Sequence, residues 1–195
     1  MTQSSWLFLR QFFTAPRSVG AVLPSSPALA DAMLAPIDFA APRTIVEFGP
    51  GTGAFTRAIA ARMQPGSRYL GIELNPAFCR KLARDFPGLT FVEGSVADLG
   101  AILAAHGIGQ VDAIVSGLPW ASLPTQLQDE VFPEVERILA PGGVFVTFAY
   151  LHGLALPAAR ALRTRLKRSF AEVSRSDIVW ANVPPALCLI CRKAG

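Results

Sequence analysis

Short apolar runs alternate with segments of helical length through most of the chain. The runs are rich in β-branched and aromatic residues and are bounded by glycine and proline, which is typical of buried strands. They cover residues 44–48, 68–73, 89–93, 111–116 and 144–148. The helical segments between them cover 54–63, 75–85, 98–105 and 125–139. This alternation predicts an α/β fold with a mostly parallel sheet that carries helices on both faces.

The last third of the chain adds a helix and two strands. The helix, expected over 155–168, carries five basic residues between Arg160 and Arg168 beside an apolar stripe. Such a helix suits either docking on phosphate groups or a solvated face. The strands, expected over 170–180 and 186–190, pair antiparallel at the sheet edge and bring the sheet to seven strands.

Residues 1–40 are expected to form an N-terminal helical extension, followed by the sheet domain over 41–195, within one domain overall. An aromatic-rich helix expected over 4–14 has one basic polar strip, which suits a helix lying in a membrane interface. The alternative is a helix packed on its own domain. A second helix starts at Ser25-Ser26-Pro27 with serine as N-cap. Its start is expected either to meet an anionic ligand group, as a cofactor lid, or to serve only as a cap.

Composition narrows the class of protein. Of the 195 residues 51% are hydrophobic and 16% are charged, which is ample for a core. No uncharged apolar run reaches about 18 residues, so no membrane span is expected. Three cysteines argue against a disulfide framework and favour a reducing, cytoplasmic compartment. Cys188 and Cys191 point to opposite faces of a strand, which favours core packing over a metal or redox site.

Three glycines at every second position, Gly49, Gly51 and Gly53, follow the first predicted strand and precede a helix. Glycine lets the backbone turn sharply and lets a ligand approach it closely, and the helix start attracts an anionic group. The same glycines fit the dinucleotide pattern of an NAD-dependent oxidoreductase. Glu47, at the end of the strand, opposes that interpretation, because its carboxylate would repel a pyrophosphate. A carboxylate there suits the amino group of an amino acid.

A second acidic residue, Glu73, ends the next predicted strand about 20 residues beyond the glycine turn, where a carboxylate reaches ribose hydroxyls. A ligand with an ammonium, a carboxylate and a ribose is S-adenosylmethionine. Ser95 and the backbone N–H of Val96 are expected to bind the adenine edge, with Asp98 either replacing Ser95 or only capping a helix. The other residues expected at this cofactor are Ser25, Ser26, Thr52, Leu74, Gly94 and Ser116.

Two motifs resemble those of known methyltransferases. Glu47-Phe-Gly-Pro-Gly-Thr-Gly53 resembles the first motif of the class I methyltransferases, which implies their Rossmann-like fold and S-adenosylmethionine as cofactor. Ser116-Gly-Leu-Pro-Trp120 resembles the Asn/Asp-Pro-Pro-Tyr and Asn-Leu-Pro-Tyr/Phe motifs of amino methyltransferases. This resemblance implies that the Ser116 side chain and the Leu118 carbonyl hold an amine and that Trp120 forms an aromatic wall. The alternative for Trp120 is core packing.

Tyr150 and His152 follow the fifth predicted strand and are further candidates for the catalytic site. In-line methyl transfer needs positioning and exclusion of water, and we expect no metal. Either side chain is placed to accept a proton from the ammonium form of an amine. For His152 the alternative is a side chain that is merely exposed.

The whole chain resembles the bacterial phospholipid N-methyltransferases. The resemblance is carried by residues 19–26, 47–53, 116–120 and 179–186. It implies an enzyme that visits the inner face of the membrane peripherally and methylates the amine of phosphatidylethanolamine and its partly methylated derivatives, towards phosphatidylcholine. The aromatic helix over 4–14 and the basic stretch 160–168 are the expected membrane contacts.

Two other functions remain as alternatives. An rRNA adenine N6-dimethyltransferase shares the cofactor motif, but that family normally has Asn at the position of Ser116 and carries a further helical domain after the sheet. Both differences favour a lipid, and no nucleic-acid partner is expected. A cofactor- and membrane-binding protein without methyl transfer is the other alternative, because an intact cofactor motif does not prove catalysis.

Overall fold

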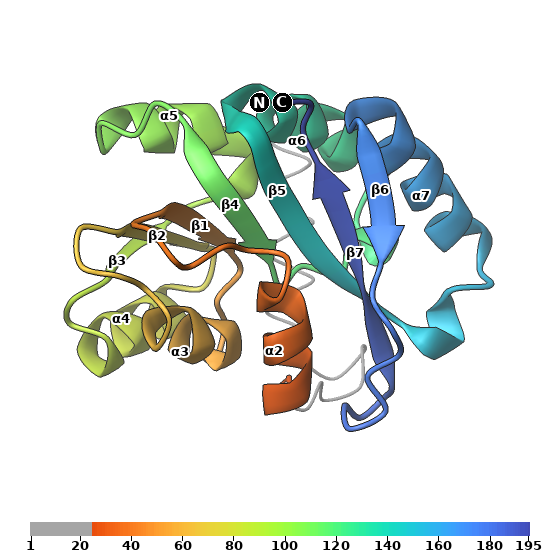
Figure 1. The fold of residues 1–195 in the computed structure, drawn as a ribbon, viewed down its shortest axis with the longest axis horizontal. Coiled ribbons are helices and arrows are strands. Elements are labelled where there is room, and N and C mark those ends of the chain that lie inside the picture. Colours follow the sequence, from red (N-terminus) through yellow and green to blue (C-terminus); the bar gives the residue numbers. More distant parts are fainter. Residues whose placement is uncertain (1–24) are drawn as a thin grey trace.

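A seven-stranded sheet organises residues 25–195, the part of the chain that the computed structural model describes. The strand order is β3-β2-β1-β4-β5-β7-β6 (Figure 1). Strands β1 to β5 are parallel, and β7 lies antiparallel between β5 and β6. The predicted α/β fold with a mostly parallel sheet is therefore confirmed. The helix expected over 4–14 lies outside the described residues.

The bounds of the strands agree with the predicted runs over most of the sheet. The strands are β1 (Thr44–Phe48), β2 (Arg68–Glu73), β3 (Thr90–Glu93), β4 (Val111–Ser116), β5 (Leu139–Tyr150), β6 (Glu172–Arg175) and β7 (Ala186–Arg192). β5 is longer than its predicted run because it pairs beyond both ends of that run, with Leu139 opposite Val111 and Tyr150 opposite Ala186, although its register with β4 shifts between Leu139 and Val144. β6 is shorter than predicted, since the chain leaves the ladder after Arg175 and forms a loop.

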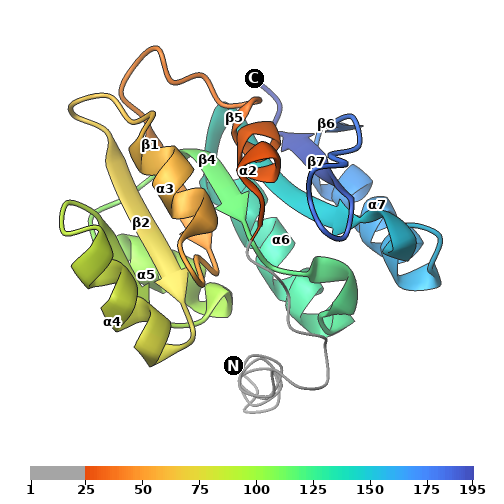
Figure 2. The same cartoon turned by 90° about the horizontal axis from the view of Figure 1, so that it is seen from below.

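Helices cover both faces of the sheet (Figures 1 and 2). They are α2 (Pro27–Leu34), α3 (Ala54–Ala60), α4 (Pro76–Asp85), α5 (Leu99–Ala105), α6 (Thr125–Ile138) and α7 (Pro157–Ser169). Buried side chains of α2 and α3 pack on one face of the sheet, and those of α5, α6 and α7 pack on the other. Short 3-10 turns follow the third, fourth and fifth strands, at Val96–Asp98, Trp120–Ser122 and Leu151–Gly153.

The two cysteines of β7 confirm the strand geometry expected from their spacing. Cys188 lies in the core on the α2 face and Cys191 lies in the core on the opposite face. Burial raises the pKa of Cys188 to about 11 and that of Cys191 to about 12. Both thiols are therefore protonated near neutral pH and serve as small apolar side chains.

Candidate functional site

The glycine loop between β1 and α3 turns through three left-handed positions. Gly49, Gly51 and Gly53 have φ angles of 63°, 56° and 85°. A side chain is strained in this region of φ, so the turn itself calls for glycine. Gly53 is also the N-cap of α3, which places the first backbone N–H groups of that helix beside the turn. The sequence pattern and the backbone therefore agree on a site at the end of β1.

The loops that follow β1 and β4 touch each other. A Cβ atom at Gly117 would lie 2.9 Å from the Gly49 carbonyl oxygen, and a Cβ atom at Gly49 would lie 2.6 Å from Cδ2 of Leu118. The Gly117 N–H donates a 2.8 Å hydrogen bond to the Phe48 carbonyl, which ties the two strand ends together. The two motifs expected to bind cofactor and acceptor therefore lie side by side.

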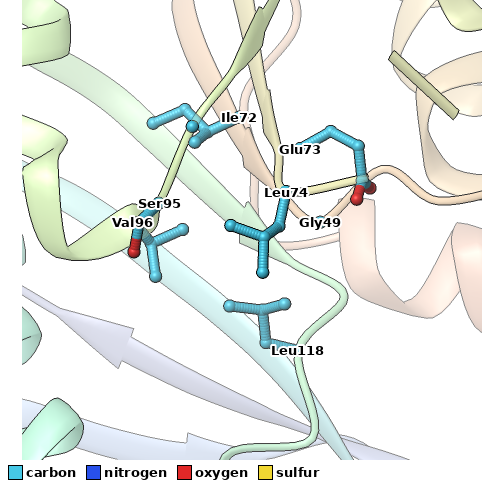
Figure 3. Close-up of a pocket in the computed structure, with 8 residues that line it drawn as sticks. Gly49, Ile72, Glu73, Leu74, Ser95, Val96 and Leu118 are labelled. Carbon is cyan, nitrogen blue, oxygen red and sulfur yellow. The ribbon is translucent and has the colours of Figure 1, made fainter. Parts of the chain in front are cut away.

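A small pocket opens at the carboxyl ends of β1 to β4 (Figure 3). It is lined by Gly49, Ile72, Glu73, Leu74, Gly94, Ser95, Val96 and Leu118. All but Ile72 were expected at the site from the sequence. Ile72 is an interior residue of a buried strand, and no local pattern distinguishes it from its neighbours. The side chains of Leu74 and Leu118 point toward one another across the pocket (Figure 3).

The Glu73 carboxylate is held in place by backbone N–H groups. One of its oxygens accepts from Gly51 at 2.9 Å and the other accepts from Asn75 at 2.8 Å. Burial raises the pKa of Glu73, although these hydrogen bonds act in the opposite direction. Each carboxylate oxygen keeps a second lone pair, so Glu73 can still accept hydrogen bonds from hydroxyl groups of a ligand.

Glu47 lies entirely within the core, immediately before the glycine loop, and does not line the pocket. Its Oε2 accepts hydrogen bonds from the Tyr69 hydroxyl at 2.5 Å and from Thr56 Oγ1 at 2.8 Å. Its Oε1 is buried without a hydrogen-bond partner. Burial is the largest cause that raises the pKa of Glu47 to about 7, and the Tyr69 and Thr56 hydrogen bonds oppose it. The sequence did not reveal Tyr69 or Thr56, because both reach Glu47 only through the fold.

Two of the serines expected at the cofactor, Ser26 and Ser95, act as helix caps. Ser26 Oγ accepts from the Leu29 N–H at 3.1 Å, and the Ser26 N–H donates to Oδ1 of Asn182 at 2.9 Å. Ser95 Oγ accepts from the Ala97 N–H at 3.2 Å while the residue lines the pocket. Ser25, Ser26 and the exposed Thr52 do not line the pocket, so the expected contact with a methionine carboxylate stays a prediction.

The acceptor motif turns its side chains inward. The Trp120 ring is buried against Phe132 and Phe145, and its Nε1–H donates a 2.8 Å hydrogen bond to Ser116 Oγ. The Leu118 carbonyl accepts from the Trp120 N–H at 3.0 Å. This placement differs from the expected aromatic wall and from a Ser116 hydroxyl facing the acceptor. Burying the large indole in the core is favourable only if its N–H finds a partner, and Ser116 supplies it.

We expect Ser116→Ala to lower the free energy of unfolding by about 1 to 3 kcal/mol, because it leaves the buried Trp120 N–H without an acceptor. Urea denaturation measures this loss, with exposed Ser122→Ala as the matched control. A Ser116→Ala protein as stable as the control would show that the hydrogen bond contributes little.

Tyr150 and His152 lie at the carboxyl end of β5, and their rings stack with centroids 5.7 Å apart. Tyr150 is half-buried and His152 is exposed. Burial raises the pKa of Tyr150, so its hydroxyl stays protonated near neutral pH and makes a poor proton acceptor. Of the two candidates, His152 is the one whose ring nitrogens are open to solvent.

Known proteins with the same architecture identify the class. The model of the methyltransferase domain family matches residues 45–143. The precorrin-6y C5,15-methyltransferase of Geobacter metallireducens superimposes with a TM-score of 0.63 at 18% identity, covering 85% of this chain and 88% of that one. A spermidine synthase in complex with the transition-state analogue AdoDATO has a TM-score of 0.68 at 11% identity, covering 87% and 62%. The fold is that of the class I methyltransferases.

One relative extends over nearly the whole chain. The ornithine lipid N-methyltransferase of Singulisphaera acidiphila is 35% identical over 190 residues, covering 96% of this chain and 95% of the relative. The chain belongs to the class I S-adenosylmethionine-dependent methyltransferases, and S-adenosylmethionine is its cofactor.

Residues at the pocket and at the neighbouring glycine loop fit this cofactor. Glu73 offers free lone pairs for ribose hydroxyls, and the unpartnered Oε1 of Glu47 is an acceptor that lacks a donor. A Cβ atom at Gly51 would meet only the Gly49 carbonyl oxygen, at 3.8 Å, so the backbone there is open to a ligand. Within residues 25–195 no cluster of His, Cys, Asp and Glu is arranged to hold a metal, and no helix of that part is long and apolar enough to cross a membrane.

Proposed function

We propose that the protein methylates the amine headgroup of a membrane lipid, with phosphatidylethanolamine and its partly methylated derivatives as acceptors, towards phosphatidylcholine. The single observation that carries the proposal is the 35% identity to an ornithine lipid N-methyltransferase over almost the full length of both chains. The name of that relative describes methylation of a lipid at nitrogen. The acceptor motif that ends at Trp120 supports an amine acceptor by its resemblance to amino methyltransferases.

The residues of the chain are proposed to position the amine acceptor and to keep water away from the reacting atoms. When bound, S-adenosylmethionine supplies an electrophilic methyl group. Leu74 and Leu118 line the pocket with apolar side chains, and we propose that they exclude water from the reacting atoms. The Leu118 carbonyl has a second lone pair beyond its bond to Trp120, and we propose that it orients the amine. His152 is the proposed group for receiving the proton that the amine releases.

The test is methyl transfer from labelled S-adenosylmethionine to three acceptors in parallel: phosphatidylethanolamine vesicles, ornithine lipid vesicles and total ribosomal RNA. Label in phosphatidylethanolamine is the expected result. Label only in ornithine lipid would keep the lipid amine and change the acceptor. Label in RNA, or in none of the three while the protein binds S-adenosylmethionine, would overturn the proposal.

A further inference from the structure

Three large apolar side chains of the described residues are strongly exposed. All three lie at the end of the sheet where the parallel strands have their carboxyl ends. They are Leu156, Trp180 and Val183, which are 56%, 68% and 65% exposed. Leu156 lies between the carboxyl end of β5 and the start of α7, and the other two lie in the loop between β6 and β7. Parallel strands end at this edge, and the cofactor pocket opens there too.

Hydrogen bonds from its buried side fix the loop that carries Trp180 and Val183. Asn182, which lies between them in sequence, is buried. Its Oδ1 accepts a hydrogen bond from the Ser26 N–H at 2.9 Å, and its Nδ2 donates one to the Pro184 carbonyl at 2.8 Å. The Pro185 carbonyl accepts from the Leu151 N–H at 2.8 Å, just beyond β5. The polar side chain therefore faces the protein while its apolar neighbours face outward. Collapse of the loop would bury these apolar groups, and the Asn182 hydrogen bonds oppose it.

Positive charge lies close to one of these apolar side chains, Leu156. Arg160 lies in the first turns of α7, close in sequence to the exposed Leu156, and Arg163 follows about one turn later. Within the described residues neither guanidinium forms an ion pair, whereas Arg165 is paired with Asp129. No acidic residue occurs from 151 to 171. Helix α7 leads away from this edge, so Lys167 and Arg168 lie at its other end (Figure 1).

We propose that Leu156 and the Trp180–Val183 loop insert into the interface of an anionic lipid bilayer, with Arg160 and Arg163 against the headgroup phosphates. Tryptophan favours the membrane interface, and unpaired arginines beside apolar side chains complement an anionic leaflet. This surface sets the mouth of the cofactor pocket against the bilayer, where a headgroup reaches it without leaving the membrane. The inference rests on the proposed function for its purpose, but it is tested separately.

The test is flotation of the full chain with vesicles of equal parts phosphatidylethanolamine and anionic phosphatidylglycerol. We expect the double variant Trp180→Ser/Val183→Ser to partition onto these vesicles about tenfold more weakly, because its inserted apolar surface is lost. Trp180→Phe keeps an apolar ring and is the matched control, with binding close to that of the unaltered protein. Arg160→Gln/Arg163→Gln is expected to weaken binding to these vesicles and not to pure phosphatidylcholine vesicles.

Two further measurements separate docking from folding and from chemistry. Affinity for S-adenosylmethionine by calorimetry should be unchanged in the double variant, because neither residue lines the pocket. Unchanged vesicle binding by the double variant would overturn the proposal. If that variant instead lost self-association in solution, the exposed side chains would be a contact between copies of the chain. If the unaltered protein binds vesicles through this loop but methylates no lipid, the docking surface stands and the proposed function fails.

Discussion

Replacing Glu47 with glutamine is expected to weaken S-adenosylmethionine binding by about a hundredfold or more, because it removes the buried charge proposed to meet the ammonium group. The unpartnered Oε1 of Glu47 is the observation behind this expectation. Isothermal calorimetry measures the affinity. Glu172→Gln, an exposed carboxylate on the edge strand β6, is the matched control and should bind as the unaltered protein does.

The same variant should make the ligand-free protein more stable above neutral pH. Folding raises the pKa of Glu47 from 4.5 to about 7, so between these values the folded state holds a proton that the unfolded state has lost. Stability therefore falls as pH rises through this window, and above about pH 7 the buried charge costs roughly 2 to 4 kcal/mol. Urea denaturation should show a gain for Glu47→Gln at pH 8 that is absent at pH 4.5.

Cofactor binding should also release a proton below pH 7. A bound ammonium group favours the ionised carboxylate, so it lowers the pKa of Glu47 in the complex. Calorimetry in buffers of different ionisation enthalpy measures the proton released. An unchanged affinity of Glu47→Gln, with no proton released at pH 6, would refute the proposed contact between Glu47 and the ammonium.

The second large effect is expected for Gly51→Val, which should abolish S-adenosylmethionine binding while the protein remains folded. Gly51 has a φ of 56°, so any side chain there is strained, at a cost of about 1 to 3 kcal/mol. The protein leaves room for the new side chain, since the nearest atom to its Cβ is 3.8 Å away. The space that valine would fill is therefore the space through which a ligand approaches the backbone.

Gly66→Val separates the effect of backbone strain from the effect of a blocked approach of the ligand. Gly66 has a φ of 86°, a Cβ atom there would lie 3.7 Å from Pro42, and the residue sits in an exposed turn before β2. Both variants should lose similar stability in thermal unfolding, and only Gly51→Val should lose cofactor affinity. Equal loss of affinity in both would mean that backbone strain, and not blocked approach, explains the result.

Much of the candidate site was predictable because its signals are local. A left-handed glycine turn between a strand and a helix is specified by Gly49, Gly51 and Gly53 themselves. Glu73 ends the neighbouring strand, and the carboxyl ends of parallel strands meet at one edge. Six of the residues expected at the cofactor line the pocket for this reason: Gly49, Glu73, Leu74, Gly94, Ser95 and Val96.

The direction of individual side chains was less predictable. Trp120 follows β4 in a place that suits an aromatic wall, yet its ring packs on Phe132 and Phe145 and its N–H binds Ser116. Glu47 was expected to face the ligand directly, yet it lies in the core with Tyr69 and Thr56. In each case the neighbours that decide the direction of the side chain lie on other elements and are brought close by the fold. Phe145 is such a neighbour of Trp120, and Tyr69 is such a neighbour of Glu47.

The sequence by itself determined the alternating strands and helices and the glycine turn, because periodicity and backbone preference act over a few residues. It indicated the class of enzyme through the resemblance of its motif over 47–53 to that of the class I methyltransferases. The tertiary structure alone decided which polar groups are paired and which apolar groups stay exposed. Asn182 shows the difference: its amide links the β6–β7 loop to Ser26 at the start of α2, 156 residues away in sequence, while the neighbouring Trp180 stays exposed. Long-range packing sets such contacts, and no local pattern encodes them.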